Sequence, residues 1–441
     1  MNNSAYKSLR IREIVQTISL THNFDKDKLI AINTSDVYNG VMGKGTLTPV
    51  EELKGQFKKT IQKDDILFSE IRPANRRFAI VTNSDCSDFV VSTKLMVLRK
   101  FNEKVDSSYF YYCLTNQPFL DILQRRAENR IGSFPQITYD LLANYAFPIP
   151  PLKEQERISK IIANIDRKIE LNRQINDNLE AMAKQLYDYW FVQFDFPNEE
   201  GKPYKSSGGA MVWNEKLKRE IPQGLGTPKI GDIEKNIITG KTPSCADEDN
   251  FGGDIPFVTI DDIRGNLFVF KAQRTLSTKG ADSQEKKYLP IGSLSVSCIG
   301  TIGVMGFVAR LAQTNQQINS IVFEHEYNKD FLYFSLKLHF ENAKAKTGNV
   351  FANMSKEEFA SIIVAYPPKQ ILQAFHNKVA PIFDSIKNNI EGINSLTKQR
   401  DELLPLLMNG QASVNYHLYV FSRTHFTLLL CPQKVQYYER Y

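Results

Sequence analysis

The stretch that decides the fold runs from Pro150 to Trp190, PPLKEQERISKIIANIDRKIELNRQINDNLEAMAKQLYDYW. It returns 217 residues later, without a gap, as Pro367 to Leu407, PPKQILQAFHNKVAPIFDSIKNNIEGINSLTKQRDELLPLL. An internal repeat of this length shows that the chain is built on a duplicated plan. In both copies a proline pair, which is favoured where helices begin, precedes a long run of helix-forming residues.

Both copies carry a seam of residues at alternating steps of four and three positions, and this spacing is typical of a coiled coil. The seam of the first copy comprises Ile158, Ile162, Ile165, Ile169, Asn172, Asn176, Leu179, Ala183, Leu186 and Trp190. The seam of the second copy comprises Phe375, Val379, Ile382, Ile386, Asn389, Ile393, Leu396, Arg400, Leu403 and Leu407.

Helices of this length extend about 60 Å, which is too long for an ordinary domain. We therefore expect the two helices to pack against each other within one chain. Asn172 matches Asn389 in the repeat, and a polar residue in a seam can fix the register. Pro381 falls inside the second helix and predicts either a kink or a helix that restarts there.

The repeat continues upstream with a drifting offset, so each long helix follows a globular module. Ile66–Ser69 resembles Leu294–Ser297, and short β-branched runs alternate with helical segments near 107–127 and 329–345. We predict α/β (α+β) modules, two and pseudo-repeated, joined by two long antiparallel coiled-coil helices. The predicted domains are a first globular module (1–150), a first long helix (151–196), a linker (197–228), a second module (229–367), a second long helix (368–412) and an atypical tail (413–441).

Composition limits the function classes. The 441 residues carry 55 Lys+Arg against 49 Asp+Glu, a net charge of +6 that permits a polyanionic partner without demanding one. The 5 cysteines are widely separated, which argues for a reducing cytoplasm, and no apolar run suits a signal peptide or a membrane span. We expect no metal site, because the histidines and cysteines lack ligand spacing.

Catalytic signatures are weak. Gly240-Lys241-Thr242 resembles the end of a phosphate-binding loop, but Lys235 stands where its first glycine belongs. Asp262, Glu285 and Lys287 follow a nuclease-like order that arises easily by chance. We therefore expect no enzyme activity from this chain.

Several tracts resemble the specificity subunit of type I restriction-modification systems. They are Phe147–Gln155 (FPIPPLKEQ), Trp190–Phe196 (WFVQFDF), Glu199–Gly224, Gly240–Ser244 (GKTPS) and Leu406–Gly410 (LLMNG). The resemblance covers about residues 1–412, with Leu225 where a Trp is expected and an unusual tail.

The resemblance implies a DNA-modification and host-defence role with a division of labour. Each module would read one half of a split site in double-stranded DNA. The helices would set the spacing and dock two methyltransferase subunits that carry S-adenosylmethionine. A restriction/translocase subunit, where present, would use ATP and Mg, and this chain would bind no cofactor itself.

Basic and amide side chains suit phosphates and base edges, so they are the candidate DNA-binding residues. In the first module these are Lys58, Lys59, Arg72, Asn75, Arg76, Arg77, Arg125, Arg126 and Arg130. In the second module these are Arg264, Lys271, Arg274, Lys279, Lys286, Lys287, Asn315, Gln316, Gln317 and Asn319.

The charge is unequally divided. Residues 1–150 carry +4, whereas residues 226–367 carry −1. A near-neutral module cannot bind tightly by counterion release alone, so we expect the isolated chain to bind DNA weakly and its partners to supply most phosphate contacts.

Three alternatives stay open at this point. The first is a specificity chain for a fused methyltransferase-nuclease. The second is a coiled-coil scaffold whose modules bind proteins. The third is an enzyme with a cryptic site at Asp262, Glu285 and Lys287.

Overall fold

The computed structural model describes residues 6–53, 55–129, 136–347, 353–408, 410, 412–413 and 429–430. The chain divides into two compact units, Met1–Ile169 with Ser395–Tyr441, and Glu170–Asn394. Both boundaries fall inside the long helices, so each unit contains one globular module and part of both helices. None of the helices described is long and apolar enough to cross a membrane.

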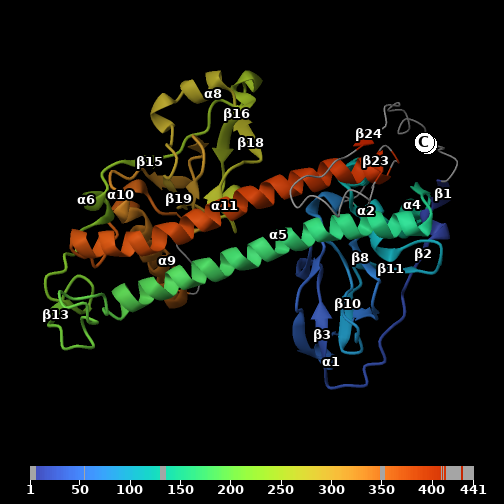
Figure 1. Cartoon of the computed structure of the whole chain (residues 1–441), viewed down its shortest axis with the longest axis horizontal. Helices are drawn as coiled ribbons and strands as arrows, with labels where there is room; N and C mark the ends of the chain where they lie inside the picture. Colours follow the sequence, from blue (N-terminus) through green and yellow to red (C-terminus); the bar gives the residue numbers. More distant parts are fainter. Residues whose placement is uncertain are drawn as a thin grey trace. The chain divides into compact units, whose positions relative to one another are not determined.

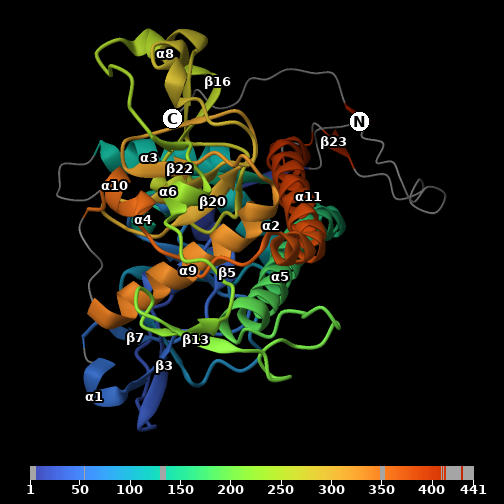
Figure 2. The same ribbon diagram turned by 90° about the vertical axis from the view of Figure 1, so that its left-hand side faces the viewer.

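The long helices are α5 (Leu152–Tyr187), continued by a π-helical turn (Asp188–Val192), and α11 (Lys369–Met408). They lie side by side (Figures 1 and 2). In the first unit Arg400 Nη1 donates to Asp166 Oδ1 at 2.9 Å, and in the second Asn389 Nδ2 donates to Asn176 Oδ1 at 2.9 Å. From the first contact to the second, the residue number increases in α5 (166 to 176) and decreases in α11 (400 to 389). The predicted antiparallel pairing is therefore confirmed.

The predicted seam residues are buried or half-buried. Ile158, Ile162, Ile169, Val379 and Ile386 are buried, and Ile165, Asn172, Leu179, Leu186, Ile382, Asn389, Ile393, Leu396 and Leu403 are half-buried. Asn389 bonds Asn176 rather than its repeat equivalent Asn172, because antiparallel helices pair residues whose numbers have a nearly constant sum.

Helix α11 runs through Pro381 without restarting, so that alternative is wrong. A proline inside a helix costs about 3 kcal/mol. Val379 and Phe383 lie on either side of it, and both are buried in the core of the second unit. Burying each such side chain contributes about 1.5–3 kcal/mol, which offsets the cost of the proline.

The ends of the helices belong to the cores of the modules. The core of the first unit includes Ile158 and Ile162 from α5 with Leu404, Leu407 and Met408 from α11. The core of the second unit includes the other ends, through Ala183, Tyr187, Trp190, Leu372 and Phe375. Each module is thereby fixed to both helices by buried apolar contacts.

The first module contains two four-stranded sheets, ordered β6-β3-β10-β7 and β2-β11-β8-β9, with β1 paired to β12 and β4 to β5. Its strands are β1 (Lys7–Arg10), β2 (Val15–Thr17), β3 (Lys28–Ile32), β4 (Val37–Tyr38), β5 (Val41–Met42), β6 (Thr46–Pro49), β7 (Phe57–Lys59), β8 (Ile66–Ser69), β9 (Phe78–Ile80), β10 (Phe89–Ser92), β11 (Leu95–Lys100) and β12 (Ala146–Ile149). Its helices are α1 (Val50–Leu53), α2 (Ser107–Thr115), α3 (Gln117–Glu128) and α4 (Tyr139–Ala143).

The second module contains a five-stranded sheet, β15-β22-β19-β20-β17, and a three-stranded sheet, β18-β16-β21. Its strands are β15 (Ile237–Thr239), β16 (Phe251–Val258), β17 (Phe268–Val269), β18 (Arg274–Leu276), β19 (Leu294–Ser297), β20 (Met305–Val308), β21 (Gln313–Thr314) and β22 (Ile318–Ile321). Its helices are α6 (Ile230–Ile233), α7 (Ile260–Ile263), α8 (Thr278–Asp282), α9 (Tyr327–Thr347) and α10 (Lys356–Ala360).

The two modules share strand order as well as sequence. Order β2-β11-β8-β9 in the first matches β15-β22-β19-β20 in the second, and every one of these pairs is antiparallel. Order β6-β3-β10 matches β18-β16-β21, in which the first pair is antiparallel and the second is parallel. The sequence repeat therefore reaches into the modules, and equivalent loops can be compared directly.

Two segments differ from the predictions. Residues 197–228, expected to be a linker, contain the hairpin β13 (Met211–Asn214) and β14 (Arg219–Pro222), and Ile221 joins the core of the second unit. The helical segment near 107–127 is two helices that meet at Asn116, whose side chain accepts from Phe119 N and begins α3. Most of the tail 413–441 lies outside the described residues; Ala412–Ser413 (β23) pairs with Leu429–Leu430 (β24).

Candidate nucleic-acid interface

In the first module the basic loop after β8 meets the β4–β5 hairpin. Arg72 and Asn75 are exposed, whereas Arg76 and Arg77 are half-buried. Asn39 N donates to Arg76 O at 2.8 Å, and Gly40 N donates to Phe78 O at 2.9 Å. The backbone of the hairpin tip is therefore bonded to the loop that carries the arginines. We call residues 38–41 and 72–77 together the module 1 surface.

Two arginines of this surface are held by neutral groups. Arg77 Nη1 donates to Ser35 O at 3.0 Å and Val37 O at 3.3 Å, and its guanidinium lies 5.4 Å from the centre of the Tyr38 ring. Arg76 Nη1 donates to Gln117 Oε1 at 3.1 Å. Among the described contacts neither arginine pairs with a carboxylate, so both positive charges can act on a phosphate.

The loop also places arginines where the backbone favours glycine. Arg72 has φ of 45° and Arg76 has φ of 53°, both in the left-handed region. The equivalent loop of the second module, between β19 and β20, has Gly300 at φ 77° and Gly303 at φ 83°. A non-glycine residue costs about 1–2 kcal/mol in this region. Strain retained at two arginines in one loop is typical of a functional site.

In the second module the predicted amide residues lie beside Lys241 and Thr242. Lys241 N donates to Thr314 O at 2.9 Å, and Thr242 Oγ1 donates to Gln316 Oε1 at 2.7 Å. Lys241 and Gln316 are exposed. A Cβ on Gly240 would lie 2.2 Å from Asn315 O, so only glycine permits this close approach. Gly240-Lys241-Thr242 thus belongs to a polar surface with Asn315, Gln316 and Gln317.

Two predicted DNA-binding residues serve the fold instead. Lys59 is half-buried, and its Nζ donates to Thr93 O at 3.0 Å and Leu95 O at 2.7 Å; burial lowers the pKa of this amine. Asn319 is 3% exposed and accepts from Thr239 Oγ1 at 2.7 Å. Both side chains have their bonding groups turned into the module, so they are not available to DNA.

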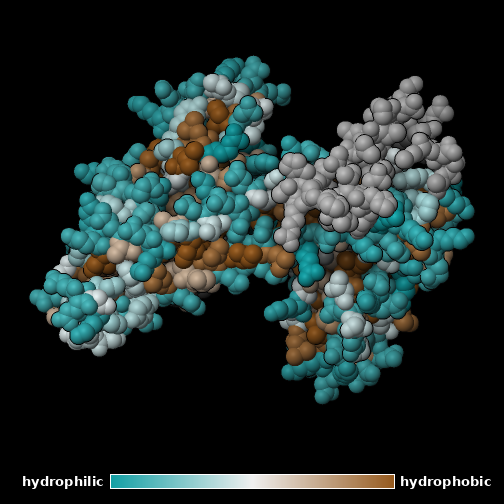
Figure 3. Space-filling view, viewed as in Figure 1, coloured by the Kyte–Doolittle hydropathy of each residue, from teal (hydrophilic) through white to brown (hydrophobic). Residues whose placement is uncertain are grey.

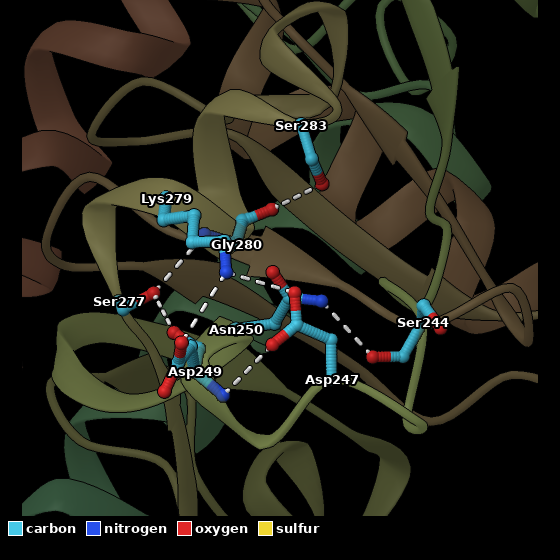
Figure 4. A network of polar contacts seen from close by, with 8 residues as sticks. All are labelled: Ser244, Asp247, Asp249, Asn250, Ser277, Lys279, Gly280 and Ser283. Atoms are coloured by element: carbon cyan, nitrogen blue, oxygen red, sulfur yellow. Dashed lines mark hydrogen bonds and ion pairs between the residues drawn. The ribbon is translucent and has the colours of Figure 1, made fainter.

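Lys279 lies in a polar network around the start of α8, which Figure 4 shows from close by. Its Nζ is 2.9 Å from Asp247 Oδ2 and 3.4 Å from Asp249 Oδ2, and the bond to Asp247 raises the pKa of Lys279. Ser277 caps the helix by accepting from Gly280 N at 3.0 Å. Because two carboxylates balance the charge of Lys279, this network argues against a phosphate contact there.

The other predicted residues are spread over their modules. Five of them have exposed side chains: Lys58, Arg125, Arg126, Lys271 and Lys286, whereas Lys287 is half-buried. Arg264 is exposed, and its Nε lies 3.8 Å from Asp261 Oδ1. Arg274 is also exposed, and its guanidinium lies 4.4 Å from the centre of the Phe251 ring. Arg130 lies outside the described residues.

The cryptic enzyme site loses its main support. Asp262 is buried, and its carboxylate accepts from Thr259 N at 2.8 Å, Thr259 Oγ1 at 2.7 Å and Gln273 N at 2.8 Å. The bonds from Thr259 cap the N-terminus of α7, and all three bonds engage the carboxylate in structural contacts. Within the described ranges no group of three His, Cys, Asp or Glu could hold a metal ion.

The sequence reasoning missed two parts of these surfaces. The hairpin tip Tyr38-Asn39-Gly40-Val41 contains Asn-Gly, the strongest short signal for a two-residue hairpin turn. Lys241 was predicted neither as a base nor as a phosphate contact, because its place beside Gln316 depends on the pairing of β15 with β22.

Most of the chain is similar to known proteins. The chain is 34% identical to the type I restriction enzyme HindI specificity subunit of Haemophilus influenzae, over 92% of this chain and 100% of that one. It is 25% identical to the type I restriction enzyme MjaIX specificity subunit of Methanocaldococcus jannaschii, over 70% of each chain. The crystal structure of the type I restriction-modification S subunit from M. genitalium matches with a TM-score of 0.50 and 15% identity, covering 92% of this chain and 97% of that one.

The family model agrees with the repeat. The type I restriction modification DNA specificity domain matches twice, at residues 6–181 and 222–401. Each match contains one module and most of the long helix that follows it. The chain therefore belongs to the family of type I restriction-modification specificity subunits, and its role is DNA recognition rather than catalysis.

Proposed function

We propose that each module reads one half of a split site in double-stranded DNA and that the paired helices set the spacing between the halves. One observation carries this proposal: two modules with the same strand order differ in the loops that present basic and amide side chains. A shared scaffold with different loops suits two readers of different sequences. Half-sites read from one face of DNA lie about 34 Å apart, a separation that helices of 36 and 40 residues are long enough to match.

The charge distribution indicates that other subunits make many of the contacts to DNA phosphates. In the module 1 surface, Arg76 and Arg77 are held by neutral groups among the described contacts. The second module carries a net charge of −1, and its Lys279 pairs with Asp247 and Asp249. Binding through phosphates alone scales with the number of neutralised charges. The modules therefore supply sequence choice, and the partners supply additional contacts to the backbone.

We further propose that helix α5 docks a methyltransferase subunit. Leu171, Ile175 and Met182 are 46%, 45% and 57% exposed, and at 3.6 residues per turn they lie on one side of the helix. Figure 3 shows hydrophobic residues along the long helices. An exposed apolar stripe on a helix suits an apolar helix of a partner. The repeat-equivalent positions of α11 are Asn388, Gly392 and Gln399, so the two helices present different surfaces.

The chemistry belongs to the partners in this proposal. S-adenosylmethionine would be held by the methyltransferase subunits, and ATP with Mg by a restriction subunit where the system has one. A fused methyltransferase-nuclease partner is the alternative arrangement, and the genes beside this one decide between the two.

The function is tested by single-molecule sequencing of methylated adenines in host DNA, with and without this gene. We expect a split motif, two short sequences around unread bases, that disappears when the gene is deleted. A methylation pattern unchanged by the deletion would contradict the function and favour a protein-binding scaffold.

Two replacements of Arg72 distinguish an effect on DNA binding from an effect on stability. Arg72→Gly removes the guanidinium but suits the left-handed backbone, as Gly300 does in the second module. Arg72→Ala removes the same group and keeps the strain. We expect both variants to weaken DNA binding by the assembled complex equally, measured by fluorescence anisotropy, while the unfolding free energy of the Gly variant stays within about 1 kcal/mol of wild type. Unchanged DNA binding by both variants would show that Arg72 does not contact DNA.

The docking stripe is tested by Leu171→Ala, Ile175→Ala and Met182→Ala combined. Truncating three exposed side chains should leave the fold intact and lower the number of methyltransferase subunits bound per chain, measured by native mass spectrometry. Arg173→Ala with Asp177→Ala is the matched control on the other side of the same turns. Equal stoichiometry in wild type, stripe variant and control would place the docking site elsewhere.

A further inference from the structure

The two modules present one structurally equivalent turn. It follows Asn33 and Asp36 in the first module, where Asn33 N donates to Asp36 Oδ2 at 2.7 Å. It follows Thr259 and Asp262 in the second, where Thr259 N donates to Asp262 Oδ2 at 2.8 Å. In both modules the segment after the turn runs alongside the strand that follows the basic or glycine loop, through Gly40 with Ala79 and Phe268 with Phe307.

We propose that these turns enter the DNA groove, with Asn39 reading a base of one half-site and Arg264 reading a base of the other. The inference rests on the proposed function and names the reading residues within it. Side chains of both turns face solvent: Tyr38 is 56% exposed beside the half-buried Asn39, and Arg264 is exposed.

The first turn is a rigid, narrow ribbon. Asn39 has φ of 46° and Gly40 has φ of 98°, as a two-residue hairpin turn requires, and both of their amides are bonded to residues 76 and 78. The major groove admits a two-stranded ribbon of this kind. A tip fixed by backbone bonds loses little conformational freedom on binding, which favours selective contacts.

The side chains on this tip have the chemistry of base readers. Within the described part of the chain, no hydrogen bond engages the side-chain amide of Asn39, which offers the donor and acceptor pair that matches adenine. Tyr38 and Val41, on either side, expose apolar surface that suits a thymine methyl group. Arg77 lies over the Tyr38 ring and can contact the adjacent phosphate.

The second turn carries a different reader on an equally fixed backbone. Arg264 N donates to Ile260 O at 3.0 Å, and Asn266 Nδ2 donates to Asp262 O at 3.0 Å, which holds the turn against α7. Among the described ion pairs, the side chain of Arg264 takes part in one, from its Nε to Asp261 Oδ1 at 3.8 Å, and both side chains are exposed. An exposed arginine suits guanine, to which it can donate two hydrogen bonds. Asn39 and Arg264 thus predict different preferences for the two halves.

The test uses the full chain assembled with its methyltransferase subunits and compares Asn39→Gly with Arg264→Ala. Asn39→Gly keeps a residue suited to the left-handed backbone and removes the side chain that carries the amide. Methylation rates are measured on duplexes that carry the motif of the wild-type complex or single-base changes at each position of either half-site. The half-site of the unaltered module serves as the internal control for each variant.

We expect each variant to lose discrimination by roughly 5- to 150-fold at one or two positions of one half-site and to keep it in the other. Unchanged discrimination at every position, or an equal loss in both half-sites, would overturn the proposal. A wild-type complex without any split motif would instead refute the proposed function on which it rests.

Discussion

The packing of α5 against α11 is the constraint on which the rest of the structure depends. The seam buries apolar side chains along both helices, and its polar contacts fix the register: Arg400 with Asp166 in the first unit and Asn389 with Asn176 in the second. Tyr112 Oη also donates to Asp166, at 3.0 Å, so the same carboxylate bonds the first module. Since the helix ends lie in the module cores, a change of register in the seam would disturb both modules.

The modules show how one scaffold supports two specificities. Strand order is retained where side chains are buried, and the loops differ in length and in residue type. Left-handed positions that are glycine in the second module are arginine in the first, at a cost of about 1–2 kcal/mol each. In the first module, positively charged side chains stand at strained backbone positions. The second module has amide side chains beside Lys241 and carries little net charge.

The duplicated plan and the seam could be predicted from the sequence because a helical period of this length is visible without tertiary information. The candidate site was less predictable. Lys59 and Asn319 were of the right type for DNA, but the direction of a side chain on a strand depends on which face the sheet buries. Asp262 likewise resembled a catalytic acid until its bonds showed that it begins α7. The Asn39-Gly40 turn was readable as a hairpin, but its contact with residues 76 and 78 depends on long-range strand pairing.

In our proposal the paired helices hold two independent readers at a set distance. The most direct measurement is the adenine methylation motif of a chain with seven residues inserted after Ile169 in α5 and seven after Asn394 in α11. Seven residues keep the phase of the seam and add about 10.5 Å, or roughly 3 base pairs at about 3.4 Å each. We expect the same two half-sites, separated by about three more unread bases. The same half-sites at the original spacing would contradict the proposal.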